Sequence, residues 1–262
     1  MEIQFYKYQG TGNDFIMIDG ENQSVNFTEK QIQSLCDRRF GIGADGLIIL
    51  RKHPELDFDM DYYNADGSKS FCGNGSRCAQ AFALFLGWIS NESTFIAIDG
   101  KHQGKQIEDN FATLMMDVDV LERIGKDYFI HTGSPHYIKY VENVDELNVV
   151  EEGRLIRNSD KYRKEGTNVN FVSEEEGYLK VRTYERGVEN ETYSCGTGVT
   201  AVAISYLNKS GRNIKEVKLL TKGGELKILL NKVNDHTFND IWLVGPAKQV
   251  CKGSFSLTLL SY

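Results

Sequence analysis

The sequence predicts an α/β (α+β) fold of two pseudo-symmetric domains that arose by internal duplication. Motifs of the first half return in the second half at a nearly constant spacing. Both halves also contain the same order of elements: an alternating strand, a glycine-containing turn, a cysteine and a largely apolar helix. In each domain we expect a curled mixed sheet or barrel around a central helix.

The duplication is carried by four pairs of segments that share residue types and order. The pairs are Gly12–Ile16 with Ser134–Ile138, Tyr63-Asn64 with Tyr184-Glu185, Cys72–Gly75 with Cys195–Gly198, and Phe95–Ile98 with Val217–Leu220. Their offsets are 122, 121, 123 and 122 residues. Because the offset changes so little along the chain, we infer that one unit was copied whole.

In the first half, a strand, a turn and a helix surround Cys72. Alternate residues from Leu56 to Tyr62 are apolar and the residues between them are aspartates, which indicates a strand with one buried face. Asp66-Gly67 indicates a turn. After Cys72 the apolar residues fall at helical spacing, and Gly87 is suited to cap the helix at its C-terminus.

The second half repeats these elements around Cys195. Alternate residues from Leu179 to Thr183 indicate a strand, and apolar residues at helical spacing after Cys195 indicate a helix that Gly211 ends. Both predicted helices are apolar over most of their circumference. Such a helix needs cover on many sides, which favours a sheet curled around it.

Composition and charge exclude several kinds of partner. The 262 residues include 30 Lys and Arg against 37 Asp and Glu, a formal charge of -7 without a basic stripe, so we expect no nucleic acid partner. The most apolar segment, 79–89, is too short to span a bilayer, and the N-terminus lacks the pattern of a signal peptide. We therefore expect a cytoplasmic location and no membrane partner.

The position of Cys72 and Cys195 points to an active thiol. Backbone N–H groups in the first turn of a helix have no intrahelical partner, and the helix dipole favours negative charge there. A thiol at such a place has a lowered pKa, and neighbouring glycines let a carboxylate approach the backbone. We expect both helix ends to face one bound carboxylate in a cleft between the domains.

This arrangement suits inversion of a carbon centre. A base must remove the proton from one face and an acid must deliver a proton to the other, and two cysteines in opposite protonation states can do both. First-turn N–H groups would stabilise the negative charge that grows on the carboxylate. We therefore expect no cofactor, pyridoxal phosphate included.

Other motifs favour ordinary structural roles. Cys36, Cys78 and Cys251 are interpreted as small hydrophobic residues, and the odd number of cysteines, five, argues against a disulfide framework. The glycines of 41–46 match a dinucleotide-binding pattern, but a helix candidate precedes them and a strand candidate follows, the reverse of the order that site requires. Cys72 and Cys78 lack metal-ligand spacing and a nearby histidine, so we expect no metal site.

The chain closely resembles the diaminopimelate epimerase family over nearly its full length. The matching motifs are Gly12-Asn13-Asp14-Phe15, Gly41–Gly46, Asn64-Ala65-Asp66-Gly67, Cys72–Cys78, Pro135-His136, Asn168, Tyr184–Gly187 and Cys195–Gly198. The resemblance implies interconversion of LL- and meso-diaminopimelate, in lysine and peptidoglycan precursor biosynthesis, with Cys72 and Cys195 as the acid/base pair.

The resemblance also implies roles for the other motif residues. Asn13, Asn64, Asn168 and Arg186 would line the substrate site, with Arg186 gripping the distal carboxylate; Gly73, Asn74, Gly196 and Thr197 would hold the reacting carboxylate through backbone N–H groups; His136 and Glu185 would lie near the α-amino group. We expect an N-terminal domain of 1–113 plus 246–262 and a C-terminal domain of 114–245. The oligomeric state is left open, and a homodimer is compatible with the sequence.

Two positions depart from the family pattern, which often has glutamine in place of Gly46 and asparagine in place of Ser134. The loop 188–191 also has one residue more than in some members.

Three alternatives stay open: a proline racemase or hydroxyproline epimerase, a redox sensor that forms a Cys72–Cys195 disulfide, and a non-catalytic amino-acid-binding protein. The polar set of asparagines and Arg186 favours a substrate with a distal amino-acid head over the first two.

Overall fold

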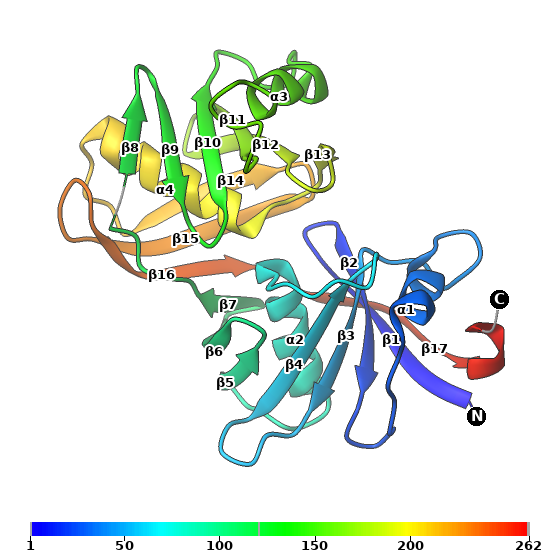
Figure 1. Cartoon of the computed structure of the whole chain (residues 1–262). Helices are drawn as coiled ribbons and strands as arrows, with labels where there is room; N and C mark the ends of the chain where they lie inside the picture. Colours follow the sequence, from blue (N-terminus) through cyan, green and yellow to red (C-terminus); the bar gives the residue numbers. More distant parts are fainter. Residues whose placement is uncertain (1, 120, 261–262) are drawn as a thin grey trace. The chain divides into compact units, whose positions relative to one another are not determined.

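The computed structural model describes residues 2–119 and 121–260, and the chain divides into two compact units (Figure 1). The first unit comprises Met1–Thr113 with Pro246–Tyr262, and the second comprises Leu114–Gly245. The second unit is therefore continuous in sequence, whereas the first is built from both ends of the chain. No helix in the described part of the chain is long and apolar enough to cross a membrane.

The first unit is an eight-stranded mixed sheet with two α-helices. Its elements are β1 (Glu2–Gly10), β2 (Asn13–Asp19), α1 (Glu29–Cys36), β3 (Gly46–Arg51), β4 (Phe58–Asn64), α2 (Gly73–Phe85), β5 (Glu92–Ala97), β6 (Gly100–Ile107), β7 (Asn110–Leu114), β17 (Lys248–Ser256) and the 3-10 helix η1 (Leu257–Leu260). The strands are ordered β17-β1-β2-β3-β4-β5-β6-β7. The β2–β3 and β4–β5 pairs are parallel and the other five pairs are antiparallel.

The second unit repeats this topology. Its elements are β8 (Leu121–Ile124), β9 (Asp127–His131), β10 (Pro135–Tyr140), α3 (Val149–Arg157), β11 (Asn168–Glu175), β12 (Tyr178–Glu185), β13 (Asn190–Thr192), α4 (Gly196–Ser210), β14 (Glu216–Thr221), β15 (Gly224–Lys232) and β16 (Phe238–Gly245). The order β8-β9-β10-β11-β12-β14-β15-β16 has the same succession of parallel and antiparallel pairs, and β13 pairs with β12 as an addition. The predicted duplication is thus present in the strand pairing.

The pairing registers refine two of the sequence matches. If Tyr63 is matched with Tyr184, at the offset of 121, their partners Leu47 and Val169 are equivalent. The partners of those residues, Ile16 and Tyr137, are then equivalent too, so the first match has an offset of 121 in place of 122. Phe95 lies opposite Phe58, as Leu219 lies opposite Leu179, which changes that offset from 122 to 124. Both matches were loose in residue type, so sequence similarity alone could not fix their register.

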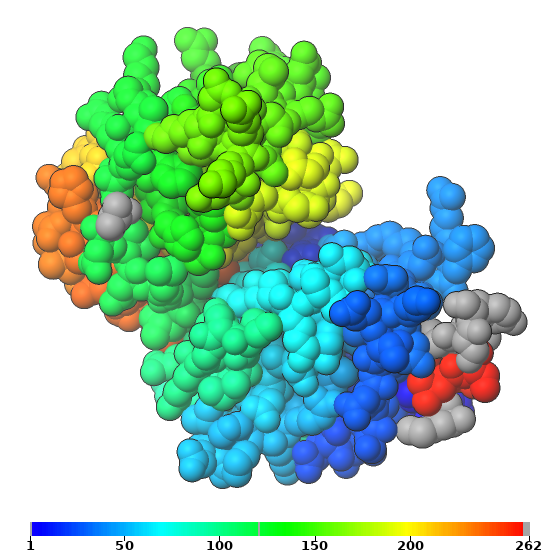
Figure 2. All heavy atoms as spheres, in the orientation of Figure 1, coloured from blue at the N-terminus to red at the C-terminus, as the bar shows by residue number. Residues whose placement is uncertain are grey.

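Each sheet curls around one buried helix. Helix α2 contacts β1, β2, β3, β4 and β6, and its residues from Gly73 to Ala83 are all buried. Helix α4 contacts β9, β10, β11, β14, β15 and β16. In Figure 2 the green part of its own unit covers most of α4 from this side. The prediction of a curled mixed sheet around a central helix is confirmed.

The sheets are partly buried on their outer faces as well. In β3, Ile48 and Leu50 pack in the core that surrounds α2, and the alternate residues Leu47 and Ile49 pack in a second core with α1. In the second unit, α3 covers the outer face, where Val149 packs with Val169, Phe171 and Tyr184. The outer helix therefore helps to fix the end of β12, which carries Tyr184 and Glu185.

The close fit of α3 on β12 gives a test of this packing. A Cβ atom at Gly153 would lie 2.4 Å from Cβ of Tyr184. Helix propensity alone would favour Gly153→Ala by about 1 kcal/mol. Because the side chain of Tyr184 is fully buried, we expect the clash to prevail and the variant to lose roughly 1–3 kcal/mol of unfolding free energy.

Urea unfolding of Gly153→Ala and of a control variant checks this expectation. Leu155→Ala is the matched control, because Leu155 lies in the same helix with 65% of its surface exposed and should have little effect. An alanine at position 153 that raised the stability would show that α3 is not held tightly against β12.

Candidate active site

Both candidate cysteines are N-caps of the central helices, as predicted. Cys72 precedes α2 with φ -134° and ψ 114°, and Cys195 precedes α4 with φ -123° and ψ 111°. The carbonyl of Cys72 accepts a hydrogen bond from Ser76 N at 2.8 Å, and that of Cys195 accepts one from Val199 N at 3.0 Å. Each sulfur therefore lies beside the first turn of its helix, where N–H groups have no intrahelical partner.

The glycines that follow each cysteine leave room for close contacts. A Cβ atom at Gly198 would lie 2.5 Å from Oδ1 of Asn170 and 3.4 Å from Sγ of Cys195. A Cβ atom at Gly75 would lie 3.4 Å from Cβ of Cys72. Gly198 in particular is required by the buried polar side chain that lies beneath it.

Cys72 is in contact with two asparagine-bearing segments of the first unit. Its sulfur accepts a hydrogen bond from Gly75 N at 3.4 Å and lies 3.5 Å from Oδ1 of Asn13. The same oxygen accepts a hydrogen bond from Nδ2 of Asn74 at 3.4 Å. Nδ2 of Asn13 donates to Asp45 at 2.7 Å, which fixes the orientation of the Asn13 amide.

An ion-pair network holds the start of β2, which carries Asn13. Asp14 pairs with Lys7 at 2.8 Å and with Arg38 at 2.6 Å, and Arg38 also reaches Asp45 at 2.7 Å. Burial alone would raise the pKa of Asp14, but the hydrogen bonds from Arg38 and Lys7 prevail and lower it to about 2. Asp14 therefore stays ionised at any physiological pH. Its ion pairs fix the backbone next to Asn13, and Asp45 of the same network accepts a hydrogen bond from the Asn13 amide.

Asn64 is the last residue of β4, and Gly46 lies opposite it in the sheet. The side chain of Asn64 donates to Oγ of Ser68 at 3.0 Å and of Ser70 at 3.1 Å, and it accepts from the Tyr62 hydroxyl at 2.8 Å. A Cβ atom at Gly46 would lie 2.5 Å from the Tyr62 ring and 2.5 Å from the Tyr63 carbonyl oxygen. The ring of Tyr62 thus occupies the space that a side chain at position 46 would need.

In the second unit, polar residues replace apolar ones where the strands approach the N-terminus of α4. Ile138 of β10 and Val172 of β11 pack in the core around α4, and His136 and Asn170 come two residues before them on the same faces. Both polar side chains are fully buried. They form a hydrogen-bonded chain beneath Thr197, in the first turn of α4.

The chain of contacts under Thr197 fixes the state of His136. Nδ2 of Asn170 donates to the Tyr137 carbonyl at 3.2 Å, and the same nitrogen lies 3.1 Å from Nδ1 of His136, which must therefore accept. Nε2 of His136 then carries the proton and donates to Oγ1 of Thr197 at 2.9 Å. Burial lowers the pKa of His136 to about 3, with minor contributions from His131 and Arg186, so the ring is neutral.

Thr197 connects this chain to Cys195. Its Oγ1 lies 3.5 Å from Sγ of Cys195, and its carbonyl accepts from Thr132 at 2.8 Å. His136 was expected beside the substrate's α-amino group. That role stays a prediction. In the structure His136 has no exposed surface, and both of its ring nitrogens are engaged, one of them with Thr197.

Asn168, Glu185 and Arg186 lie together at the adjoining ends of β11 and β12. Oδ1 of Asn168 accepts from the backbone N–H of Arg186 at 2.9 Å, and its Nδ2 donates to Oγ of Ser134 at 2.9 Å. The exposed guanidinium of Arg186 donates to the Glu165 carbonyl at 2.9 Å and lies 3.5 Å from Oγ of Ser134. Glu185 accepts from Oγ1 of Thr192 at 2.8 Å.

Within the first unit the structure brings together Cys72, Asn13, Gly73 and Asn74, while Asn64 lies at the end of β4 and contacts Ser68 and Ser70. Within the second it gathers Cys195, Gly196, Thr197 and His136, and separately Asn168, Glu185 and Arg186. The sequence did not single out Asp45 and Asn170, which orient Asn13 and His136. Asn170 could have been found by its alternation with Asn168 and Val172 on one strand face.

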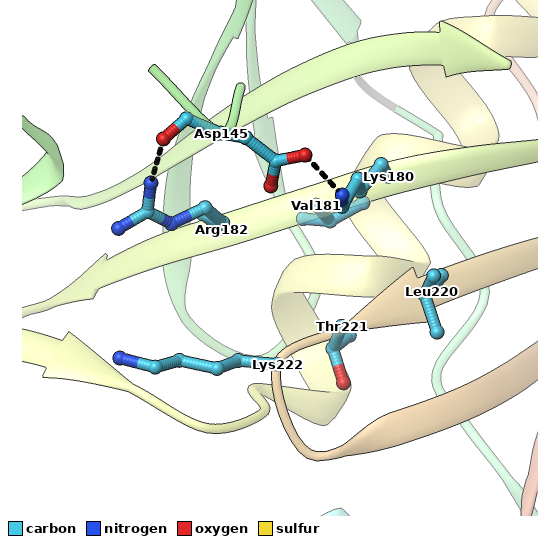
Figure 3. A pocket seen from close by; sticks show the side chains of 7 residues that line it. All are labelled: Asp145, Lys180, Val181, Arg182, Leu220, Thr221 and Lys222. Carbon is cyan, nitrogen blue, oxygen red and sulfur yellow. Dashed lines mark hydrogen bonds and ion pairs between the residues drawn. The ribbon is translucent and has the colours of Figure 1, made fainter. Parts of the chain in front are cut away.

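Other parts of the chain offer weaker candidates. A hollow of about 260 Å³ in the second unit is lined by Asp145, Lys180, Val181, Arg182, Leu220, Thr221 and Lys222 (Figure 3). Its charges are already paired, since Lys180 meets Asp145 while Arg182 and Lys222 meet Glu191. Among the described residues no group of three or more His, Cys, Asp or Glu side chains could hold a metal ion.

The chain matches a family model and curated relatives over nearly its full length. The family model described as diaminopimelate epimerase matches residues 5–120 and 128–250. The chain is 47% identical over 254 residues to the diaminopimelate epimerase of Flavobacterium psychrophilum, covering 95% of this chain and 98% of that one. It is 37% identical over 284 residues to that of Aquifex aeolicus, covering 99% of this chain and 100% of the other.

Solved structures share the fold at low sequence identity. A phenazine biosynthesis protein of the PhzF family from Bacillus anthracis matches with a TM-score of 0.74 at 13% identity, covering 98% of this chain and 100% of that one. A probable proline racemase from Agrobacterium radiobacter matches with a TM-score of 0.69 at 15% identity, covering 97% and 93%. On the family model and the full-length relatives, the chain belongs to the diaminopimelate epimerase family and is an isomerase.

Proposed function

We propose that Cys72 and Cys195 are the acid/base pair with which this epimerase interconverts LL- and meso-diaminopimelate. The observation that supports the pair most strongly is the equivalence of the two sites. Each cysteine is the N-cap of a buried helix, at the same place in the same topology. An inverting reaction needs one proton-transfer group for each face of the carbon, and a duplicated site supplies two.

In this proposal the reacting carboxylate lies between the two helix N-termini. Backbone N–H groups of Gly73 and Asn74, and of Gly196 and Thr197, would hold it. These groups have no intrahelical acceptor, and the helix dipoles add partial positive charge. Negative charge grows on the carboxylate as the α-proton leaves, so these donors would stabilise the transition state more than the ground state.

The proton balance of the reaction needs no further group. The thiolate takes the α-proton and becomes a thiol, and the opposite thiol gives its proton to the other face and becomes a thiolate. The protein thus ends each turnover with the two protonation states exchanged. The same site can then run the reaction in reverse, while exchange with solvent restores the starting state.

The distal end of the substrate would be bound by a second group of residues in the second unit. Arg186 is exposed and has guanidinium N–H groups beyond the two that contact Glu165 and Ser134. These groups can donate hydrogen bonds to a substrate carboxylate. Asn168 holds the Arg186 backbone, and the Ser134 hydroxyl connects the two side chains. Asn13, Asn64 and Glu185 would complete the polar lining.

We further propose that the protein acts in the cytoplasm on a free amino acid, without nucleic acid, membrane or cofactor. The net charge of -7 and the absence of any basic stripe in the sequence support this assignment. The polar side chains proposed to line the site suit a zwitterionic substrate with a second amino-acid head.

Specificity for the distal carboxylate is tested by Arg186→Lys. An ammonium cannot reproduce the planar fork of a guanidinium, so we expect kcat/KM for diaminopimelate to fall by roughly ten- to a hundredfold. Arg212→Lys is the control, since Arg212 lies just beyond the C-terminal end of α4 and contacts Tyr206 there. Parental kinetics in Arg186→Lys would remove Arg186 from the site.

The two-base mechanism is tested by turnover of LL-diaminopimelate in heavy water at low conversion. One thiolate removes protium from its face, and the other thiol, already exchanged with solvent, delivers deuterium. Mass spectrometry should find deuterium at the inverted carbon of the product and little in recovered substrate. Protium carried from substrate to product in the first turnover would instead indicate a single base that serves both faces.

Single substitutions test the roles of the two sulfurs. We expect Cys72→Ala and Cys195→Ala each to lower epimerisation by at least about two to four orders of magnitude, because each removes one proton-transfer group. Cys251→Ala is the matched control, since Cys251 is exposed on β17, and it should keep parental activity. If either active-site variant epimerised near the parental rate, that cysteine would not be part of the pair.

A further inference from the structure

Helix α2 carries a buried guanidinium whose partners are all neutral. Arg77 has no exposed surface. It donates to Oδ1 of Asn74 at 3.0 Å, to Oγ1 of Thr11 at 3.3 Å and to the Gly73 carbonyl at 3.4 Å. Its Nε has no hydrogen-bond partner among the residues that the structure describes. These contacts place the charge beside the first turn of α2.

The location makes an uncompensated cation costly. The N-terminal end of a helix already carries partial positive charge, which repels a guanidinium. A buried ion is also deprived of water and needs a nearby counter-charge. Burial lowers the pKa of Arg77 to about 10, so the group is still a cation at neutral pH. An anion near the start of α2 would offset the free-energy cost of burying this positive charge.

Among the described residues of the first unit, the groups around Arg77 leave one candidate for that anion. Of the two thiols that act on Arg77 electrostatically, Cys78 is fully buried, and burial raises its pKa far above the usual range. On β1, burial raises the pKa of Tyr8 to about 12, so this phenol is neutral too. The remaining thiol is Cys72, whose neighbour Gly73 is in direct contact with Arg77.

Charged groups on the other strands around α2 are engaged elsewhere. They include Asp14 of β2 with Lys7 and Arg38, Asp19 of β2 with Asn22, Asp59 of β4 with His53, Asp61 of β4 with Arg51 and Lys69, and His102 of β6 with Asp99. The amide oxygen of Asn13 faces the Cys72 sulfur at 3.5 Å. That contact is long and involves a neutral amide, whereas the buried guanidinium of Arg77 carries a full positive charge.

The second unit has no such charge at the equivalent place. Five residues after Cys195, as Arg77 is five residues after Cys72, stands Thr200, whose Oγ1 donates to the Gly196 carbonyl at 2.9 Å. Thr200 thus contacts the carbonyl equivalent to that of Gly73, with a hydroxyl in place of a guanidinium. Both helices offer a dipole to their cysteine, but in the described part of the chain the position five residues after the cysteine holds a buried cation only in the first unit.

We propose that Arg77 is a positioning residue that stabilises the thiolate of Cys72, so that in the ligand-free protein Cys72 is the thiolate and Cys195 the thiol. Cys72 releases its proton to solvent, and no other bond changes. The inference rests on the proposed acid/base pair and adds which member starts as the base. It also gives Arg77 a second task, since its contact with Asn74 orients the amide that meets Asn13.

The test measures alkylation of each cysteine by iodoacetamide as a function of pH in the full-length protein without substrate. Peptide mapping reports Cys72 and Cys195 in the same sample, so each serves as the internal control for the other. We expect the parental protein to show a lower midpoint pH for Cys72 than for Cys195. In Arg77→Gln the midpoint for Cys72 should rise by about one pH unit or more, and that for Cys195 should not rise.

Two further variants separate charge from packing. Arg77→Lys keeps the charge and should keep most of the low midpoint of Cys72. Thr200→Val removes the matching contact to the Gly196 carbonyl without changing charge, and it should leave both midpoints in place. The acid limb of the kcat/KM profile should move upward in Arg77→Gln together with the Cys72 midpoint.

Three results would overturn the proposal. One is a Cys72 midpoint that Arg77→Gln leaves unchanged, and another is an equal rise in Arg77→Gln and Arg77→Lys. The third, which needs only the parental protein if Arg77→Gln does not fold, is a Cys195 midpoint equal to or below that of Cys72. Turnover of diaminopimelate by the parental protein tests the proposed function separately, because alkylation is measured without substrate.

Discussion

The structure depends on how the first turn of each buried helix is satisfied. A helix enclosed by a sheet cannot expose its N-terminal N–H groups to bulk water, yet those groups need acceptors. Here the Cys72 sulfur accepts a hydrogen bond from Gly75 N in the first turn of α2, and the substrate that we propose would accept from other N–H groups in the first turns of both helices. Glycines at Gly75 and Gly198 keep this space open, and the sheet strands end there in polar residues.

Strand alternation explains how a hydrophobic core and a polar site share one face of a sheet. On the inner faces of β10 and β11, Ile138 and Val172 give way to His136 and Asn170 within two residues. The apolar residues pack the strands against α4. This packing also fixes the backbone positions of the polar residues two positions away. Precise positions for Thr197 and Cys195 therefore come from the core itself and need no separate loop.

Much of this could be predicted from the sequence, for physical reasons. Alternation in 56–62 and the apolar stretch after Cys72 report directly on burial, and the equivalent motifs around Cys195 revealed the repeat. The burial of His136 could not be predicted, because it depends on Asn170 and Thr197 from distant segments. Nor could the state of Arg77, since a charged residue five positions into a helix normally lies in solvent.

The pairing of β1 with β17 affects how the protein can fold while it is being synthesised. During synthesis, the second unit is complete when residue 245 has been made, and it can then fold as a continuous segment. In the first unit, β1 lacks its partner strand until residues 248–256 emerge from the ribosome, so one edge of the sheet stays unpaired. A ribosome-bound chain shortened before β17 would thus display an open strand, the kind of edge that chaperones cover and that aggregation exploits.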